Sequence, residues 1–420
     1  MKRVFMVSIF AVSFFVGGCK PKVSCEVFSH RVVSDKQNVT AGFAEKEDLI
    51  HTATEYFLTI RAGDQKSPIE VVFDTGSSNL ILPGQDCVGC KKGTRYKPGK
   101  SATFTGKGYP ISYNSAKADV MEAQDTVGLL CGPRVQTHVG MITQGQNAQG
   151  ILGAAYGPIM KPAGHNRKTF FDNYFEQTGE EQIFGLLMCG EKSGSKIEVG
   201  GRLEEVREKD RKFSWTPVVH NTYYVVAALS AKIANSTNVL GHFPHPDSDG
   251  KTNATIVDTG STFSMLPPDM YQALVSELKR IALKENIALP VDFFGETGGL
   301  KAVPVEMAES DLNKFPTLEF ELIGGGAKQE ALVDKETFLQ KGIDKTPITL
   351  KIDPEHYFKV VKKGEKHLKR VFSFRSAGTA KLFILGQPLF ESNYYVEIVR
   401  KDQQGNGLIG FASNAGLCGD

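Results

Sequence analysis

The sequence predicts a mostly β protein built from two similar lobes. Three observations lead to this prediction. The chain has 420 residues, it contains many short runs of Val, Ile, Phe, Tyr and Thr between 43 Gly and 19 Pro residues, and one sequence motif occurs twice. A chain of this length exceeds one ordinary domain and suits two lobes of roughly 150 to 200 residues each. Short β-branched and aromatic runs between turn residues are typical of β-sheet.

The overall composition is that of a globular protein without a strong charge bias. Hydrophobic residues make up 41% of the chain and charged residues 23%, which is enough to bury a full core. The 49 basic and 47 acidic residues leave a net charge of +2. A dedicated nucleic-acid-binding protein usually carries a clear basic excess, so this class of function is not expected.

The N-terminal residues predict export. Lys2 and Arg3 precede a mainly apolar stretch of thirteen residues, 4–16, which is too short to cross a hydrocarbon core of about 30 Å. We therefore expect residues 1–18 to be a signal peptide. The stretch ends in Val-Gly-Gly-Cys19, which resembles the lipobox of bacterial lipoproteins. This resemblance implies a lipid anchor on Cys19 in the periplasm, outer membrane or cell surface. The alternative is an ordinary secretory signal.

The remaining chain divides into a leading segment and two halves. Residues 19–50 are polar and mixed, and we expect them to form a tether. The predicted N-terminal lobe covers 51–212 and the C-terminal lobe 213–420. Strand-like apolar runs occur at 56–60, 69–73, 80–82, 215–219, 223–226 and 255–257. Residues 268–285 predict an amphipathic helix, because apolar residues recur on one face and a proline begins the segment.

A motif repeated at the scale of a lobe carries the strongest functional signal. The sequence VVFDTGSSNLILP spans residues 71–83, and TIVDTGSTFSMLP spans 255–267. In each copy an apolar strand leads into Asp-Thr-Gly-Ser, and Leu-Pro follows. A duplicated lobe of this kind would bring Asp74 and Asp258 together about a pseudo-twofold axis.

Two adjacent carboxyl groups can hydrolyse a peptide bond without a covalent intermediate. The reaction needs a base for the attacking water and a proton donor for the carbonyl oxygen. Two carboxyl groups about 3 Å apart do not both ionise easily, so one keeps a proton while the other acts as base. Such a pair titrates as one coupled unit.

The residues after each aspartate suit this chemistry. Glycine permits close backbone approach, a serine hydroxyl can bind the outer carboxylate oxygen, and threonine can tie the two loops together. These supporting residues are Thr75, Gly76 and Ser77 in the first loop and Thr259, Gly260 and Ser261 in the second.

The cysteines are expected to form disulfides in an exported protein. Cys87 and Cys90 form a CxxC pair for which we expect a small local disulfide, since no second CxxC completes a zinc site. The pairing of the others stays open; they are Cys25, Cys131, Cys189 and Cys418. We expect no metal at the proline-rich loop 242–249, although it contains two histidines and two aspartates.

Over roughly residues 51–420 the chain resembles the pepsin family of aspartic proteases. Besides the two Asp-Thr-Gly motifs, four landmarks recur in family order: the apolar-apolar-Gly segments 150–153 and 383–386, the small disulfide loop 87–90, and the closing strand 407–412. The resemblance implies two β-rich lobes with a substrate cleft between them. The shared proton described above is an established property of aspartic-protease dyads.

The resemblance also implies a β-hairpin flap over the cleft. Tyr113 matches the flap tyrosine, which positions substrate and helps to exclude water. The family usually has glycines after this tyrosine, whereas residues 114–116 and the expected tip, 117–119, contain none. Ile81 stands where many relatives carry a tryptophan, so a polar N–H partner for the tyrosine is absent.

The sequence therefore predicts an aspartic endopeptidase acting on polypeptides at acidic to weakly acidic pH. We expect a monomer that needs no metal or organic cofactor. The alternative is a pepsin-fold binding or inhibitor protein without proteolytic activity. Both Asp-Thr-Gly motifs are intact, which favours the enzyme, but the altered flap keeps the alternative open.

Overall fold

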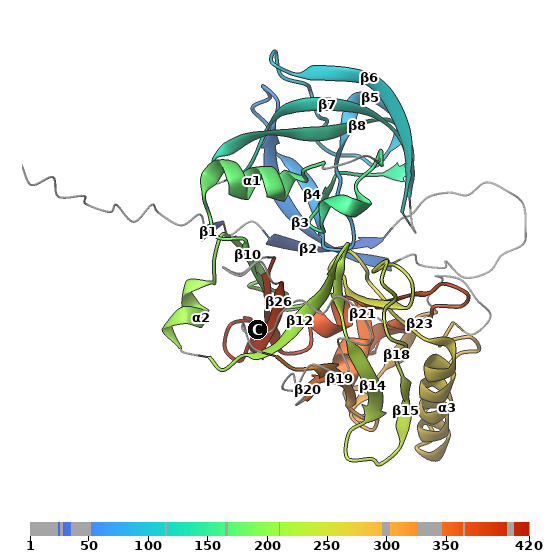
Figure 1. The fold of residues 1–420 in the computed structure, drawn as a ribbon. Helices are drawn as coiled ribbons and strands as arrows, with labels where there is room; N and C mark the ends of the chain where they lie inside the picture. The colour runs from blue at the N-terminus through green and yellow to red at the C-terminus, as the bar shows by residue number, and fades with distance from the viewer. Residues whose placement is uncertain are drawn as a thin grey trace, which may run out of the picture.

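A computed structural model of the chain describes eleven ranges: residues 24–25, 28–34, 52–113, 116–130, 132–163, 167–209, 211–295, 303–325, 347–363, 366–400 and 407–419. The predicted signal peptide, Cys19 and flap residues 114–115 lie outside them. The described chain is mostly β-strand and forms an upper body of blue to green strands above a lower body whose strands run mainly from yellow-green to red (Figure 1). The mostly β, two-lobed fold class is confirmed.

The upper lobe is organised around one eight-stranded sheet, whose strands β3 and β7 also pair with each other. In sheet order its strands are β2 (Phe28–Ser34), β3 (Thr52–Ala62), β4 (Ile69–Asp74), β9 (Ile151–Gly153), β5 (Leu80–Cys90), β8 (Arg134–Ala148), β7 (Lys117–Leu129) and β6 (Thr103–Ser112). Helix α1 (Phe170–Thr178) packs against β8.

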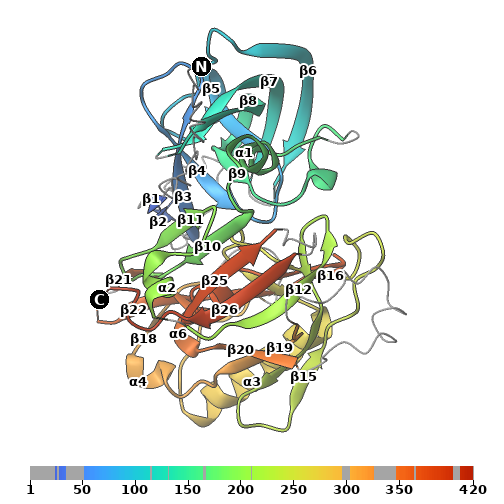
Figure 2. The same ribbon diagram turned by 60° about the vertical axis from the view of Figure 1, so that its left-hand side comes forward.

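An eleven-stranded sheet joins strands from both halves of the chain. In sheet order they are β1 (Ser24–Cys25), β11 (Lys196–Val199), β10 (Ile183–Leu187), β25 (Tyr394–Val399), β26 (Leu408–Ser413), β12 (Ser214–Asn221), β13 (Tyr224–Val226), β16 (Ala254–Val257), β24 (Leu382–Leu385), β17 (Ser264–Leu266) and β23 (Phe374–Ser376). Figure 2 shows β10, β11 and α2 (Glu204–Glu208) with the lower body, although they precede the expected boundary at residue 213.

Two smaller sheets and several helices complete the lower lobe. The four-stranded sheet contains β15 (Val239–His242), β14 (Ala228–Ile233), β19 (Leu318–Ile323) and β20 (Pro347–Ile352). The three-stranded sheet contains β18 (Val305–Met307), β22 (Leu368–Phe372) and β21 (Phe358–Lys363). The helices are α3 (Pro268–Lys284), α4 (Glu309–Leu312), α6 (Pro354–Tyr357) and α7 (Gln387–Phe390), and the upper lobe adds the short η1 (Gly157–Ile159).

Helix α3 forms where the amphipathic pattern predicts it and ends one residue earlier. Its buried face includes Tyr271, Leu274, Val275 and Leu278, whereas Ile281 is only half-buried. This face packs against β15 and β23. The helix forms because its apolar residues recur at a spacing that places them on one side.

The strands that precede the repeated motif are buried on both faces. Strand β4 is buried at every position except Glu70, and all four residues of β16 are buried. Each has a parallel partner, β9 for β4 and β24 for β16. Parallel strands covered on both sides read as continuous apolar runs, and the motif strands have this pattern. Both motif loops therefore emerge from rigid, buried supports.

The segment expected to be a tether contributes two strands. β1 pairs antiparallel with β11, and β2 pairs antiparallel with β3 over seven residues. The sequence shows no strong strand periodicity here, and the pairing depends on exposed edges that the rest of the fold provides. Among the described residues, no helix is long and apolar enough to cross a membrane.

Candidate active site

The two aspartates of the repeated motif lie at the ends of equivalent strands. Asp74 is the last residue of β4, and Asp258 follows directly after β16. Both are buried, with 8% and 7% of their surface exposed. Their side chains are close enough to share a hydrogen bond, although 184 positions separate them in sequence. The fold therefore brings together the two carboxyl groups that the sequence pairs.

Reciprocal hydrogen bonds tie the two motif loops together. The amide of Thr75 donates to Oγ1 of Thr259 at 3.1 Å, and the amide of Thr259 donates to Oγ1 of Thr75 at 2.9 Å. Each hydroxyl then donates across the axis to the carbonyl of Val257 or Phe73, both at 2.9 Å. Both threonines are fully buried. Because water cannot compete for these bonds, neither loop can shift without disturbing the other.

Each carboxylate is held by the same two donors from its own loop. The amides of Gly76 and Gly260 donate to Oδ1 of Asp74 and Asp258, both at 2.8 Å. The hydroxyls at the third position after each aspartate donate to Oδ2, Ser77 at 2.5 Å and Ser261 at 2.7 Å. These bonds fix the plane of each carboxyl group.

The glycine of each loop lies directly against the aspartate of the other loop. A Cβ atom on Gly76 would stand 2.5 Å from Cγ of Asp258, and one on Gly260 would collide with Oδ1 of Asp74. Real Cβ atoms do not approach other atoms so closely. Glycine is therefore required at both positions to let the carboxyl groups meet, rather than for an unusual backbone dihedral.

Burial and mutual repulsion favour a protonated pair. Burial, and then the negative charge of Asp258, raise the pKa of Asp74 from 3.8 to about 8, against the lowering effect of the Ser77 and Gly76 donors. Burial also raises the pKa of Asp258, while hydrogen bonds from Ser261 and Asp74 oppose the increase. One proton stays on the pair after the first has ionised, so the site holds an acid and a base together.

The strands beneath the motif loops support them from below. The amide of Ala154 donates to the carbonyl of Asp74 at 2.7 Å, and the amide of Ala155 donates to that of Ser77 at 2.8 Å. In the second lobe the amide of Asp258 donates to Leu385 at 3.0 Å, and that of Gln387 to Ser261 at 2.9 Å. The predicted apolar-apolar-Gly segments thus lie under the loops in both lobes.

The hairpin expected to form the flap consists of β6 and β7, and β6 ends just before Tyr113. Ser112 pairs with Lys117, and the amide of Tyr113 donates to the carbonyl of Ala116 at 2.8 Å. The expected tip at 117–119 is wrong: these residues are the first of β7. The hairpin therefore closes between Tyr113 and Ala116, before the expected tip.

The hydroxyl of Tyr113 faces the first motif loop. Burial, and then the charge of Asp74, raise the pKa of Tyr113, whereas the nearby Ser77 hydroxyl lowers it. The oxygen is buried but completes no hydrogen bond of normal geometry within the described residues. The ring packs in the apolar cluster that contains Ile81, the residue expected to remove a polar partner. The local packing agrees with that expectation.

A second tyrosine near the aspartates escaped the sequence analysis. Tyr223 precedes β13 and is half-buried, and its pKa is raised by burial, then by the charges of Asp258 and Asp74. Tyr113 from the upper lobe and Tyr223 from the lower lobe thus both lie near enough to the aspartates for their pKa values to be raised by them. The sequence did not indicate this, because Tyr223-Tyr224 has only the pattern of a strand. The nearness of Tyr223 to the aspartates depends on the fold.

Two disulfides stabilise the described chain. Cys87 joins Cys90, the local pair that the sequence favours, and Cys189 joins Cys418 across a sequence separation of 229. The second bridge is one of the pairings left open by the sequence. Cys131 lies outside the described residues, and for Cys25 only the backbone strand is described.

The described residues contain no group of three or more His, Cys, Asp or Glu that could hold a metal ion. The histidine-containing loop before β16 closes instead on Asp249, whose carboxylate accepts from the amides of Lys251 and Thr252 at 2.8 Å each. These bonds lower the pKa of Asp249 to about 2. Asp249 thus stabilises the turn in this loop.

Comparison with known proteins shows which family model and which relatives this chain resembles. A family model described as eukaryotic aspartyl protease matches residues 55–413. The chain is 28% identical over 264 residues to pepsin-2B of Gadus morhua, a match that covers 60% of this chain and 75% of that protein. It is 30% identical over 224 residues to cathepsin E of Aquarana catesbeiana, covering 50% of this chain and 53% of the relative.

A third relative matches a longer stretch at lower identity. The β-secretase of Strongylocentrotus purpuratus is 23% identical over 320 residues, covering 69% of this chain and 57% of that protein. The chain thus spans between about half and three quarters of the length of these three relatives.

Proposed function

The chain belongs to the aspartyl protease family, and on that premise we propose that it is an aspartic endopeptidase with Asp74 and Asp258 as its catalytic pair. The observation that carries the proposal is the contact between these two carboxyl groups, each buried and each held by the same glycine amide and serine hydroxyl. A buried pair with raised pKa values supplies a base and an acid at one place.

The proposed reaction is attack of water on a substrate peptide carbonyl. The ionised aspartate takes a proton from the water as its oxygen bonds to the carbonyl carbon, while the protonated aspartate gives its proton to the carbonyl oxygen. The resulting diol then collapses: the C–N bond breaks, the amine leaves with a proton from the pair, and a diol hydroxyl returns one. The pair regains its single proton, and the products are a carboxyl group and an amine.

The substrate of this proposal is an extended polypeptide bound under the flap hairpin. Tyr113 would cover the scissile bond and exclude water, and Tyr223 would line the opposite side. Excluding water strengthens the electrostatic action of the carboxyl groups on the developing charge. The mechanism assigns no step to a metal or an organic cofactor.

The same proposal includes an exported, monomeric enzyme with two lobes, although β10, β11 and α2 lie with the lower lobe ahead of the boundary expected at residue 213. The basic and then apolar residues 1–18 favour export, and Cys19 would carry a lipid anchor if the lipobox resemblance is functional. Mass spectrometry of the mature N-terminus from the natural membrane fraction tests this part. An N-terminal diacylated Cys19 supports the anchor, and an unmodified mature N-terminus refutes it.

Proteolysis is tested with protein lacking residues 1–19 and a denatured protein as substrate. Cleavage is measured from pH 3 to pH 7 for the wild type, Asp74→Asn and Asp258→Asn, with and without pepstatin. The proposal expects acid-side cleavage that pepstatin blocks and that each substitution reduces by at least about 10³-fold. A folded wild type without cleavage at any pH would instead favour a binding protein. Cleavage that survives both substitutions would contradict the catalytic pair.

A further inference from the structure

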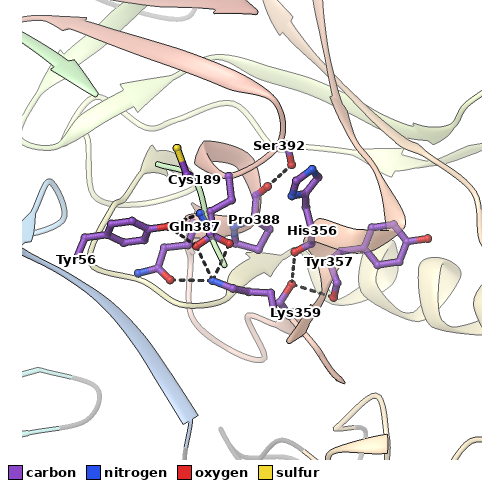
Figure 3. A network of polar contacts seen from close by, with 12 residues as sticks. Tyr56, Cys189, His356, Tyr357, Lys359, Gln387, Pro388 and Ser392 are labelled. Atoms are coloured by element: carbon purple, nitrogen blue, oxygen red, sulfur yellow. Dashed lines mark hydrogen bonds and ion pairs between the residues drawn. The ribbon is translucent and has the colours of Figure 1, made fainter. Parts of the chain in front are cut away.

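A buried polar cluster lies directly behind the second motif loop, outside the proposed catalytic pair. It consists of Tyr56 from β3, Lys359 from β21, Gln387 at the start of α7, and Glu391 just after that helix. All four are buried, and Tyr56 and Gln387 have no exposed surface. Figure 3 shows the side chains of Tyr56, Lys359 and Gln387 converging on one point.

The cluster is held together by hydrogen bonds to one buried amine. Nζ of Lys359 lies 2.9 Å from Oε1 of Gln387 and 3.0 Å from the carboxylate of Glu391 (Figure 3). The hydroxyl of Tyr56 donates to the same carboxylate at 2.8 Å and accepts from the amide of Gly190 at 3.1 Å. Desolvating a lysine and a glutamate is expensive, and these extra bonds offset part of the cost.

Gln387 connects this cluster to the catalytic loop. Its Nε2 donates to the carbonyl of Thr259 at 3.2 Å, and its backbone amide donates to the carbonyl of Ser261 at 2.9 Å. Thr259 is the residue whose amide and hydroxyl bind the opposite loop, and Ser261 binds the carboxylate of Asp258. Gln387 thus holds the loop through one side-chain bond and one backbone bond.

Lys359 determines which way the Gln387 amide points. An ammonium group only donates hydrogen bonds, so it must face the amide oxygen, and the NH₂ group is then directed at the Thr259 carbonyl. Burial lowers the pKa of Lys359, and the nearby carboxylates of Glu391 and Glu191 oppose this effect. The position of Nζ, within hydrogen-bonding distance of both Gln387 and Glu391, is what turns the amide oxygen toward the lysine.

We propose that Gln387 is a positioning residue for catalysis, with its amide fixing the Thr259 carbonyl and with Lys359 fixing the amide. The inference rests on the proposed function and deepens it. It assigns the geometry of the Asp258 loop in part to Gln387, a residue that does not contact the carboxylates of the two aspartates. Small displacements of a catalytic group reduce turnover strongly even where binding survives.

The test is the pH dependence of Gln387→Glu relative to the wild type. The substitution keeps the shape and the acceptor for Lys359 but removes the donor to Thr259 whenever the new carboxyl group is ionised. At pH 6 we expect kcat to fall about 10- to 100-fold with KM changed less than about 3-fold. As the pH falls to 3 the carboxyl group gains a proton and can donate, so kcat returns to within about 3-fold of the wild type.

Two further variants separate positioning from general destabilisation. Gln387→Met fills the same volume without a donor and is expected to lose kcat by the same factor at every pH. Ser392→Ala removes a buried hydroxyl that donates to the Pro388 carbonyl in the same region, and it is expected to keep the wild-type kcat. Circular dichroism and thermal melting at each pH establish that the variants are folded.

The charged and titratable groups around Gln387 are Lys359, Glu391, Glu191 and Tyr56, and they are common to all variants. Gln387→Met adds no ionisable group, so its ratio to the wild type serves as the baseline against which the pH dependence of Gln387→Glu is compared. A ratio for Gln387→Glu that stays flat from pH 3 to pH 6, or a Gln387→Met enzyme with full kcat, would overturn the inference. An inert wild type would instead refute the proposed function, so the two failures are distinct.

Discussion

Thr75 and Thr259 exchange hydrogen bonds from backbone amide to side-chain hydroxyl in both directions, at 3.1 and 2.9 Å. This exchange places Asp74 and Asp258 side by side at the junction of two lobes. Because the contact is reciprocal, the loops form one buried unit rather than two independent turns. A unit of this kind explains why each loop also needs a glycine that makes room for the opposite aspartate.

The first prediction concerns the effect of the proposed catalytic pair on stability. The folded pKa of Asp74 is raised from 3.8 to about 8, so the protonated form is favoured by folding. The stability that protonated Asp74 gives to the folded state is fully present below pH 4. It is lost as the pH rises through the pKa of Asp74 in the folded state. Asp74→Asn should therefore be more stable than the wild type at pH 7, by roughly 2–5 kcal/mol, and equally stable near pH 3.

Urea denaturation at several pH values measures this difference. The stability gap should widen steadily between pH 4 and pH 8. A difference in stability that is constant with pH would show that burying the ionised form of Asp74 does not destabilise the folded protein.

The second prediction concerns the flap tyrosine. Because the Tyr113 hydroxyl is buried without a completed hydrogen bond in the described chain, removing it loses little. We expect Tyr113→Phe to keep kcat/KM within about 5-fold and to leave stability unchanged or raised by about 0.5–1 kcal/mol. Tyr113→Ala, which removes the ring from its apolar cluster, should lower kcat/KM by about 100-fold or more. Steady-state kinetics decide this: equal losses for both variants would show that the hydroxyl acts directly.

The third prediction concerns Arg400, whose side chain is 1% exposed. Its guanidinium binds Asp172 at 2.6 Å, the Tyr224 hydroxyl at 3.1 Å and the carbonyl of Ala154, which lies under the first motif loop. Removing it takes the arginine away from Oδ1 of Asp172 and leaves the buried Ala154 carbonyl with only the Tyr224 hydroxyl as a side-chain donor. Arg400→Met should destabilise the protein by about 3–5 kcal/mol.

Arg280→Met is the matched control for Arg400→Met. The Arg280 side chain is 60% exposed and pairs with Glu277 on the surface of α3. Such exposed pairs contribute little, so we expect no measurable change in stability. Chemical denaturation of both variants gives the comparison. Similar small changes would contradict the structural role assigned to Arg400.

The fourth prediction ranks the two disulfides. In the chain-entropy account a bridge stabilises more when it closes a longer loop. The Cys189–Cys418 bridge has a sequence separation of 229, whereas Cys87–Cys90 has a separation of 3. Replacing Cys189 and Cys418 by serine should cost about 3–5 kcal/mol, and replacing Cys87 and Cys90 less than about 2 kcal/mol. Melting curves of the two double variants test the order, and a reversed order would contradict it.

Much of the fold was predictable because local patterns and the repeated motif agree with it. The apolar runs before Asp74 and Asp258 are buried parallel strands, and 268–285 forms the expected helix with a one-residue difference. The position of the hairpin's turn was predicted wrongly. Lys117 was expected at the turn, but it pairs with Ser112 between strands β7 and β6. Pairing partners are decided by distant segments, which a local pattern does not contain.

The supporting polar clusters were not predictable from the sequence. Lys359 interrupts an apolar run and Gln387 follows Leu-Gly, and such residues read as surface positions by composition alone. Their burial becomes clear only when β21, α7 and β3 pack together. The same applies to the Cys189–Cys418 bridge, since the six cysteines other than Cys19 allow fifteen pairings.

The most direct test of the central claim is whether Asp74 and Asp258 act as one unit. Cleavage rates of Asp74→Asn, Asp258→Asn and the double variant are compared with the wild type on one peptide substrate. If the two carboxyl groups share one proton and one water, each single substitution should cost about as much as the double, at least about 10³-fold. If the double variant loses the product of the two single effects, or if either single variant stays active, the aspartates act independently and the account is wrong.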